Sequence, residues 1–360
     1  MPRQHRSTSP IKLSQNALLL AFIGVPAFLF GLGARIRRRL YGLPGAVRQA
    51  EVPVISVGNL TVGGTGKTTI VAWLVRRLQQ RGRTPAVVSR GYLGRVGRGP
   101  LMVSRGDGPL VEARVSGDEP YLLARSLPGA IVVAGSDRVE GCRAAREAGA
   151  DVVILDDGFQ HLRLARDLDL VLLDAHSPFG NYRLLPAGTL REPASGLRRA
   201  DVVLITRSRL DESFEVLERV VRRYHREVPI LRSGHRCSGF FDYDGHAVDR
   251  PTRVVAFCGI GNPDAFVTDL ESQGVEVAAF RPFRDHHSFT ADDWSALVEM
   301  ATAHDACLLT TEKDLVRLTP DLRGAAAADV VAMRIEAVVH DADVLIERVE
   351  QVLARHAGSS

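Results

Sequence analysis

Residues 58–69 read Gly58-Asn59-Leu60-Thr61-Val62-Gly63-Gly64-Thr65-Gly66-Lys67-Thr68-Thr69. The apolar stretch Val52 to Val57 precedes this run, and the helix-like stretch Ile70 to Gln80 follows it. A strand, a glycine-rich loop and a helix in this order form a phosphate cradle, because the loop's backbone N–H groups turn inward and the helix N-terminus favours an anion. The sequence therefore predicts that a nucleoside triphosphate binds here.

Lys67 and Thr68 have the most specific expected roles in this cradle. Lys67 can reach the β- and γ-phosphate oxygens, and the Thr68 hydroxyl can hold Mg²⁺. The predicted nucleotide contacts are Thr61, Val62, Gly63, Gly64, Thr65, Gly66, Lys67, Thr68 and Thr69. Thr61 stands where the pattern G-x-x-x-x-G-K-[ST] has its first glycine. A plain glycine-rich turn is the alternative, and the strand before the loop and the helix after it argue against that alternative.

The composition indicates a globular protein of two domains. The chain has 360 residues, of which 45% are hydrophobic and 24% charged, so it can bury a sizeable core and is not disordered. It has four widely spaced cysteines, without a C-x-x-C pair or a nearby histidine cluster of zinc spacing. We therefore expect reduced thiols in a cytosolic compartment.

The net charge of +4 belongs to the N-terminal segment. Residues 1–50 contain eight Lys or Arg and no Asp or Glu, which leaves 38 basic against 42 acidic residues in the rest of the chain. The body of the protein is thus slightly acidic, so the high isoelectric point is no argument for nucleic-acid binding.

The same segment holds an uncharged, mostly apolar run, Ala17 to Ala34, followed by Arg35, Arg37, Arg38 and Arg39. As a helix this run would reach roughly 27 Å, just short of the roughly 30 Å hydrocarbon core of a bilayer. Three alternatives are open: a cleaved signal peptide, a spanning or half-inserted anchor, and a buried core helix. Export would separate the P-loop from cytosolic ATP, and glycines and a proline weaken a long core helix. The arginines match anionic headgroups, so we expect a membrane-associated helix at the cytoplasmic face.

Short apolar runs alternate with helical stretches along residues 52–206, which predicts a doubly wound parallel α/β sheet of the P-loop NTPase type. The predicted strands are Val52–Val57, Pro85–Ser89, Ala130–Ala134, Val152–Leu155, Leu170–Leu173 and Val202–Thr206. A second, smaller α/β unit is predicted from the runs Val254–Cys258, Val275–Phe280, Cys307–Thr310 and Val330–Met333 and the helix Val344–Arg355.

Between these units, Tyr243-Asp244-Gly245-His246 suggests a hairpin turn. The predicted organisation has four parts: a basic N-terminal segment with a membrane-associated helix (1–50), a P-loop domain (51–235), a β-hairpin-like linker (236–252) and a smaller C-terminal α/β domain (253–360).

Two carboxylate pairs stand at the ends of predicted strands or in loops. Asp156 and Asp157 end an apolar strand, where a P-loop enzyme needs oxygen ligands for Mg²⁺ beside the phosphates; a helix cap or a turn is the alternative. Asp118 and Glu119 lie in the loop Ser116–Pro120. That loop is either the start of a helix, a place for a catalytic carboxylate, or both.

Two loops carry further polar residues. Arg284-Asp285-His286-His287-Ser288-Phe289 places histidines beside a carboxylate, and such a histidine can take a proton from a hydroxyl nucleophile. The basic and aromatic loop Arg90–Arg98 can embrace an anionic substrate. An ordinary solvated surface loop is the alternative for both segments.

Together these pieces resemble one family, the tetraacyldisaccharide 4'-kinases, which are the lipid A 4'-kinases of Gram-negative bacteria. The resemblance runs from about Leu18 to the last predicted helix, and the joint order of its motifs is highly specific. The motifs are VGNLTVGGTGKT (Val57–Thr68), SRGY (Ser89–Tyr92), GDEP (Gly117–Pro120), DDGFQH (Asp156–His161), LLPAGTLREP (Leu184–Pro193), GIGNP (Gly259–Pro263), RDHHSF (Arg284–Phe289) and TTEKD (Thr310–Asp314).

The resemblance implies an ATP- and Mg²⁺-dependent kinase. Its expected reaction transfers the γ-phosphate to the 4'-hydroxyl of a tetraacylated glucosamine disaccharide 1-phosphate, at the cytoplasmic face of the inner membrane. It also implies a P-loop domain and a smaller C-terminal domain joined by a short β linker. The implied partners are the lipid A disaccharide precursor and the membrane surface, with no nucleic acid and no obligate protein partner.

Residue roles follow from the matching motifs. Asp118 would be the base that activates the sugar hydroxyl, with His286 as its partner and Lys67 at the phosphates. Since Asp118 and His286 lie in different predicted domains, we expect closure to bring them together. Mg²⁺ would be organised by Thr68, Glu119, Asp156 and Asp157. The side chains expected near nucleotide or lipid phosphate are Arg90, Tyr92, Gln160, His161 and Arg191.

Three alternative functions share the P-loop but not phosphoryl transfer to a small molecule. A GTPase switch would want [NT]-K-x-D, and in the nearest string, Thr311-Glu312-Lys313-Asp314, the lysine is displaced. A partitioning-type ATPase would carry its signature lysine at the position of Val62. A membrane-tethered scaffold would leave the carboxylates without a role.

Overall fold

The computed structural model describes residues 11–92, 94–97, 99–208, 214–319, 322 and 329–358, and their side chains except those of 11–23 and 357. The described helices are α1 (Ile11–Leu40), α2 (Lys67–Gln79), α3 (Ala113–Ser116), α4 (Asp118–Ser126), α5 (Arg138–Glu147), η1 (Ala194–Arg199), α6 (Phe214–Arg222), α7 (Pro263–Ser272), α8 (Ala291–Ala303), α9 (Glu312–Leu315) and α11 (Ala342–Ala357). The described strands are β1 (Val54–Asn59), β2 (Pro85–Ser89), β3 (Leu101–Arg105), β4 (Ile131–Ala134), β5 (Val152–Asp156), β6 (Leu168–Asp174), β7 (Val202–Thr206), β8 (Ile230–Phe241), β9 (Ala247–Val248), β10 (Arg253–Cys258), β11 (Glu276–Pro282), β12 (Cys307–Thr311) and β13 (Val330–Val339).

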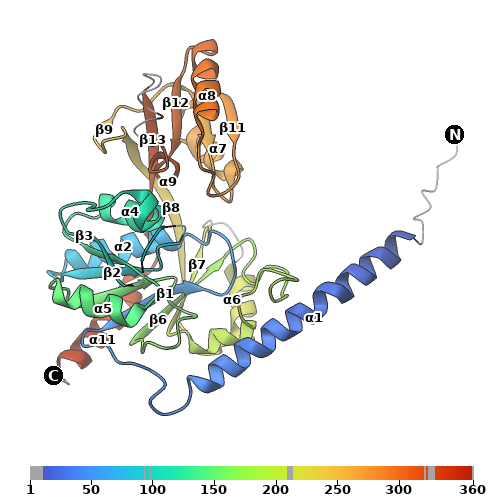
Figure 1. Ribbon diagram of the computed structural model, residues 1–360, viewed down its shortest axis with the longest axis vertical. Helices are drawn as coiled ribbons and strands as arrows, with labels where there is room; N and C mark the ends of the chain where they lie inside the picture. Colours follow the sequence, from blue (N-terminus) through green and yellow to red (C-terminus); the bar gives the residue numbers. More distant parts are fainter. Residues whose placement is uncertain are drawn as a thin grey trace.

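The strands pair in the order β11-β10-β12-β13-β8-β7-β6-β1-β5-β2-β4-β3, and β9 pairs with β8 (Figure 1). β1 lies between β5 and β6 and runs parallel to both. Apolar side chains of this part of the sheet pack against α2, α4 and α11 on one face and against α5, η1 and α6 on the other. The predicted doubly wound parallel sheet is therefore confirmed, with β3 added as an antiparallel edge strand.

β8 links two lobes of the molecule. Its first residues, Ile230 to Arg232, pair in parallel with β7, whereas residues 233–241 pair antiparallel with β13. We call β1–β7 and the helices packed on them the first lobe, and β9–β12 with α7, α8 and α9 the second lobe (Figure 1). At the predicted hairpin turn, Asp242 accepts a hydrogen bond from the backbone of His246 at 2.8 Å, and β9 returns along β8. The domain boundaries given above stay a prediction.

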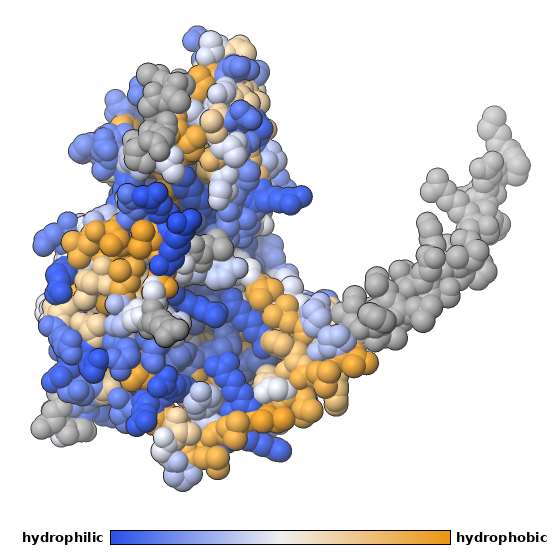
Figure 2. Space-filling model, in the orientation of Figure 1, coloured by the Kyte–Doolittle hydropathy of each residue, from blue (hydrophilic) through white to orange (hydrophobic). Residues whose placement is uncertain are grey.

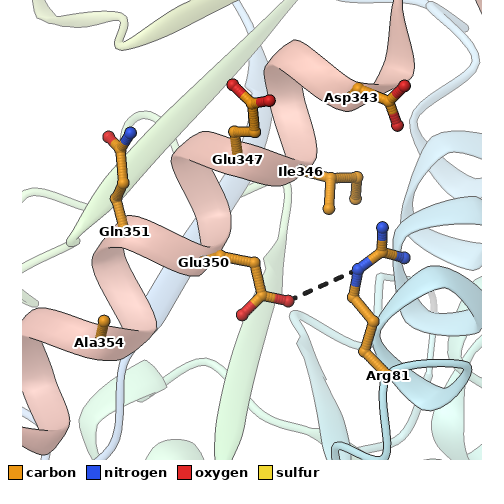
Figure 3. Close-up of a pocket in the computed structure, with 7 residues that line it drawn as sticks. All are labelled: Arg81, Asp343, Ile346, Glu347, Glu350, Gln351 and Ala354. Atoms are coloured by element: carbon orange, nitrogen blue, oxygen red, sulfur yellow. Dashed lines mark ion pairs between the residues drawn. The ribbon is translucent and has the colours of Figure 1, made fainter.

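The last helix, α11, returns to the first lobe. The sequence places it in the predicted 253–360 domain, whereas Leu345, Val349 and Leu353 pack in one cluster with Ile55 and Leu74. The reason is that β13 leads the chain back to the open apolar side of the first lobe's sheet. Residues of α11 and Arg81, which follows α2, line a hollow of about 560 Å³, and Arg81 Nε lies 3.5 Å from Glu350 (Figure 3).

The N-terminal helix α1 projects away from the body (Figure 1). Near its C-terminal half, Gly31 lies against Leu184, so that a Cβ added at Gly31 would lie 2.6 Å from a methyl carbon of that leucine. Apolar side chains of α1 are exposed and form an orange band in Figure 2: Val25, Phe28, Leu29, Phe30, Leu32, Ile36 and Leu40. Within the described part of the chain, no helix has both the length and the hydropathy to span a bilayer.

The packing of α11 predicts that its buried side chains stabilise the first lobe. We expect Leu345→Ala to lower the free energy of unfolding by about 3 kcal/mol, because Leu345 is fully buried and the change leaves a cavity. Urea unfolding followed by tryptophan fluorescence measures this change. The neighbouring Val344 is 40% exposed, so Val344→Ala is the matched control and should change stability by less than about 0.5 kcal/mol. Equal effects of the two changes would contradict the packing.

Candidate active site

The glycine-rich loop joins β1 to α2. Gly66 precedes the helix in the left-handed conformation (φ 75°), which a glycine adopts readily. Thr61 forms an antiparallel bridge with Leu190, and the Val62 N–H donates to the Thr189 carbonyl at 2.8 Å. An extended, paired residue needs no glycine, and this explains why a β-branched threonine fits at the irregular first position.

Lys67 is held at the start of α2 by acceptors from two strand ends. Its Nζ lies 3.3 Å from Asn59 Oδ1 and 3.5 Å from Asp157 Oδ1. On the other side of the loop, Arg207 donates to the Gly64 carbonyl and pairs with Asp174. The sequence reasoning did not identify Arg207, although its position directly after a predicted strand was a signal.

Asp156 and Asp157 have different surroundings. Asp156 is buried; its Oδ2 accepts a hydrogen bond from Ser89 at 3.2 Å, and its Oδ1 has no partner. Burial and the charge of Glu119 raise the pKa of Asp156, despite Lys67. A buried carboxylate oxygen without a partner is one that a bound cation would satisfy.

Asp157 accepts hydrogen bonds from Arg191 Nη1 at 2.8 and 2.6 Å. Burial acts to raise the pKa of Asp157, but Lys67 and Arg191 outweigh burial and hold that pKa below its usual value. The two neighbouring carboxylates therefore differ: Asp157 is paired with protein cations, whereas Oδ1 of Asp156 has no protein partner.

The side chains at this edge of the sheet are compatible with a Mg²⁺ ion that takes only a few of its ligands from the protein. Thr68 at the loop, the free oxygen of Asp156, and Glu119, whose charge acts on Asp156, could donate oxygens to a cation, while the predicted ligand Asp157 is paired with Arg191. Among the described residues, no group of three or more His, Cys, Asp or Glu side chains is arranged to hold a metal. Mg²⁺ usually binds through one or two carboxylates, phosphate oxygens and water, so a sparse donor set suits it.

Close backbone packing brings the Tyr92 loop against Asp118. Gly117 has a positive φ of 91°, and a Cβ there would lie 2.5 Å from the Tyr92 carbonyl oxygen. A Cβ at Gly94 would lie 2.6 Å from the Val115 carbonyl oxygen. Only glycines allow this approach, so the motifs SRGY and GDEP form one surface, with Asp118 at the first residue of α4.

Asp118 and His286 are brought together across the two lobes. Asp118 Oδ2 lies 3.6 Å from His286 Nδ1 and accepts a hydrogen bond from Arg317 Nε at 2.7 Å. The Tyr92 ring meets the His286 ring edge-on, with centroids 6.1 Å apart. Burial acts to raise the pKa of Asp118, but His286 and Arg317 outweigh burial and lower that pKa. Asp118 is therefore ionised at neutral pH.

Lys313 and Arg317 are site residues that the sequence reasoning missed. Lys313 Nζ lies 3.3 Å from His286 Nε2 and 3.7 Å from Glu119 Oε1. The motif TTEKD contains Lys313, and Arg317 follows four residues later, about one helical turn away. That spacing was the available signal.

The predicted phosphate contacts fall into three groups. Tyr92 is 62% exposed beside His286, and Arg90 is exposed at the end of β2. Arg191 is bound to Asp157. Gln160 donates to the Asn59 carbonyl at 2.8 Å and to Glu192 at 3.0 Å. Its amide nitrogen therefore links the end of β1 to the segment that contains Glu192.

His161 lies in a cationic environment. Burial and the charges of Arg138 and Arg37 lower the pKa of His161 to about 4, and its Nε2 is buried without a partner. Arg138 is itself buried and donates to the Asp156 carbonyl at 3.2 Å. Because Arg37 belongs to α1, the C-terminal end of that helix is electrostatically coupled to this group.

Comparisons with known proteins agree over nearly the whole chain. A family model described as tetraacyldisaccharide-1-P 4'-kinase (LpxK) matches residues 18–354. The tetraacyldisaccharide 4'-kinase of Geobacter sulfurreducens is 45% identical over 313 residues, which cover 85% of this chain and 86% of that protein. The corresponding kinase of Anaeromyxobacter dehalogenans is 44% identical over 341 residues, covering 90% and 89%. A crystal structure of LpxK from Aquifex aeolicus in complex with ATP matches with a TM-score of 0.74 and 32% identity, covering 94% of this chain and 99% of that chain.

The surroundings of His161 predict an acid-sensitive contribution to stability. The ordinary histidine pKa is 6.5, and that of His161 in the fold is about 4. Between these values the unfolded chain binds a proton that the folded chain does not, so the free energy of unfolding falls as pH falls from 6.5 to 4. We expect His161→Gln to flatten this part of the stability curve, measured by urea unfolding at several pH values.

The control for this experiment is His176→Gln, because the His176 side chain is 61% exposed and lies outside the buried surroundings of His161. That change should leave the pH dependence close to the wild-type curve. A His161→Gln curve that parallels the wild type between pH 6.5 and 4 would contradict the prediction.

Proposed function

The chain belongs to the tetraacyldisaccharide-1-P 4'-kinase family, and we propose that its reaction takes place between the P-loop and the Asp118–His286 contact. It is a phosphotransferase that acts on a hydroxyl group, the lipid A 4'-kinase, with ATP as phosphoryl donor and Mg²⁺ as cofactor. The GTPase and partitioning-ATPase alternatives are not favoured, because the match to this family covers nearly the whole chain.

One observation carries the assignment of the site. Asp118 faces His286 and Arg317 of the second lobe, while the next residue, Glu119, acts electrostatically on Asp156 at the metal site. The proposed base and a proposed metal ligand are thus adjacent in the chain. An acceptor hydroxyl that is hydrogen-bonded to the Asp118 carboxylate would therefore lie next to the phosphoryl group that it attacks.

The chain's own side chains supply positioning and proton transfer, which phosphoryl transfer chiefly requires. Lys67 and the backbone of residues 61–69 hold the phosphates. Thr68, Glu119 and Asp156 hold the cation, which neutralises charge on the phosphate oxygens when bound. Arg317 and His286 both contact Oδ2 of Asp118, which leaves Oδ1 to accept the proton of the acceptor hydroxyl.

We also propose that cationic side chains bind the acceptor. Arg90 and Arg138 act electrostatically on each other, and Arg138 and Arg37 of α1 act on His161, whose low pKa keeps its ring neutral at pH 7. An anionic disaccharide phosphate would be attracted to this group, with Tyr92 beside the sugar. The unpartnered Nε2 of His161 supports this role, because a buried polar atom without a partner is one that a ligand can satisfy.

The family's role in lipid A synthesis implies membrane association. We propose that α1 lies on the cytoplasmic face of the inner membrane, with its exposed apolar side in the lipid. The arginines that follow the apolar part of the helix support this placement, because they match anionic headgroups. The acyl chains of the acceptor would then lie in the same layer as α1.

The role of Asp118 predicts a large loss of turnover on removal of its charge. With labelled ATP, Mg²⁺ and the disaccharide lipid in detergent, we expect Asp118→Asn to lower kcat by about 10²- to 10⁴-fold, since the hydroxyl loses its general base. ATP affinity should stay within about threefold of the wild type. Asp107→Asn, at an exposed position of the same lobe, is the control and should keep wild-type turnover. Full turnover by Asp118→Asn would rule out Asp118 as the general base. If the wild-type protein produced no labelled lipid, the assignment of kinase activity would be overturned.

The placement of α1 predicts binding to anionic vesicles. We expect the fourfold change of Arg35, Arg37, Arg38 and Arg39 to Gln to reduce partitioning onto phosphatidylglycerol vesicles at least tenfold, because each arginine near the surface contributes about 1 kcal/mol. Sedimentation with the vesicles measures the bound fraction. Partitioning onto phosphatidylcholine vesicles, which have no net charge, is the control and should change little. Unchanged binding to the anionic vesicles would exclude the arginines as headgroup contacts.

A further inference from the structure

We propose that Arg317 is a positioning residue that fixes the Asp118 carboxylate from the opposite lobe. The guanidinium group orients the carboxylate and makes its productive orientation depend on the approach of the two lobes. This inference rests on the proposed role of Asp118 as the base that accepts the hydroxyl proton.

The geometry of Arg317 supports this role. Its side chain is only 5% exposed, and its three nitrogens contact different partners. Nη1 lies 2.7 Å from Asp314 Oδ1 and 3.0 Å from the Gly259 carbonyl oxygen, and Nη2 lies 3.2 Å from His286 Nδ1. These partners belong to the second lobe. Nε alone reaches across to the first lobe, where it donates to Asp118 Oδ2 at 2.7 Å.

Arg317 is itself held in place by a buried carboxylate. Asp314 is fully buried, and its Oδ2 accepts a hydrogen bond from Thr311 at 2.7 Å. The neighbours Leu315 and Leu318 belong to the second lobe's apolar core. A buried ion pair adds little to stability compared with well-packed apolar residues, so the stability of this lobe alone does not explain an arginine here. The bond to Asp118, outside the lobe, is what the arginine adds.

The contact also fixes the His286 ring. Arg317 approaches Nδ1, and Lys313 approaches Nε2 at 3.3 Å, so a cationic side chain stands at each ring nitrogen. The ring lies between them with its edge near Asp118 Oδ2. A lysine at position 317 could not reproduce this arrangement, because one ammonium nitrogen cannot reach the three directions that the planar guanidinium covers.

The test compares Arg317→Met with Arg166→Met. Arg166 is a matched control, because its side chain is only 11% exposed, pairs with a carboxylate (Asp169, 3.0 Å) and donates to a carbonyl (Leu164, 2.9 Å), all within the first lobe. We expect Arg317→Met to lower kcat about 10²-fold with KM for ATP nearly unchanged, since a misplacement of about 1 Å has an effect of this size. Arg166→Met should keep the wild-type kcat even where it lowers Tm.

Chemical rescue separates positioning from folding. In Arg317→Ala, added guanidinium ion at tens of millimolar should raise kcat several-fold, whereas Arg166→Ala and Asp118→Asn should not respond. If Arg317→Met does not fold, Arg317→Lys is the variant that tests the inference. It keeps the positive charge, and its kcat should still fall at least tenfold. In an Asp118→Asn background, Arg317→Met should cause no further loss, because the arginine acts through that carboxylate.

The outcomes distinguish this inference from the proposed function. Wild-type turnover by Asp118→Asn would remove the base, and the inference with it. A loss with Asp118→Asn together with normal kcat in Arg317→Met and Arg317→Lys would overturn the inference alone. Equal kcat losses in Arg317→Met and Arg166→Met would reduce Arg317 to a structural role and also overturn it.

Discussion

The parallel pairing of β1 with β5 and β6 is the constraint on which the rest of the structure depends. Parallel strands end at the same edge of a sheet, so residues far apart in sequence arrive at one place. Val57 pairs with Asp156, and Asn59 pairs with Leu172. The P-loop therefore leaves β1 beside the carboxylates that end β5. The second lobe is attached to the same sheet through β8, next to β7, and its α9 meets α4 above this edge (Figure 1).

The sequence predicts the positions of most strands well, but it predicts less well which elements pair with or pack against one another. The apolar runs match strands to within two residues at each end, because burial on both faces demands continuous apolar runs. β13 is the exception, since it extends six residues beyond the predicted Val330–Met333. Periodicity cannot say which surface covers an apolar helix, and the packing of α11 on the first lobe was missed for that reason. β3 was missed because only part of that strand is buried. The length of β8 was missed because its first residues pair with β7 and the remaining residues with β13, so no single burial pattern runs along it.

The same limit applies to the site. The motif resemblance predicted that Asp118 and His286 act together, and their side chains lie 3.6 Å apart in the structure. The same resemblance predicted one role, Mg²⁺ binding, for both Asp156 and Asp157. Adjacent residues of a strand end point in different directions, so one carboxylate is buried with a free oxygen and the other faces Arg191. Their pKa values consequently move in opposite directions. Arg317 is one of 46 Lys and Arg residues, and only the fold distinguishes it from a surface arginine.

The connection between the lobes explains why side-chain contacts must define the catalytic geometry. β8 and β13 form an antiparallel ribbon from Ser233–Val339 to Phe241–Ala332, with an irregularity between Arg334 and Ile335, and β9 and β12 join it at the Phe241–Ala332 end. A ribbon of this kind resists sliding, because sliding would break its ladder, but it can bend and twist. Side chains also tie the ribbon to the first lobe, because Arg76 of α2 pairs with Glu336 of β13 at 3.3 Å and Arg125 of α4 donates to the Tyr243 carbonyl. Side-chain contacts between the lobes, such as that between Arg317 and Asp118, therefore fix the angle at which the proposed base and the phosphates are aligned.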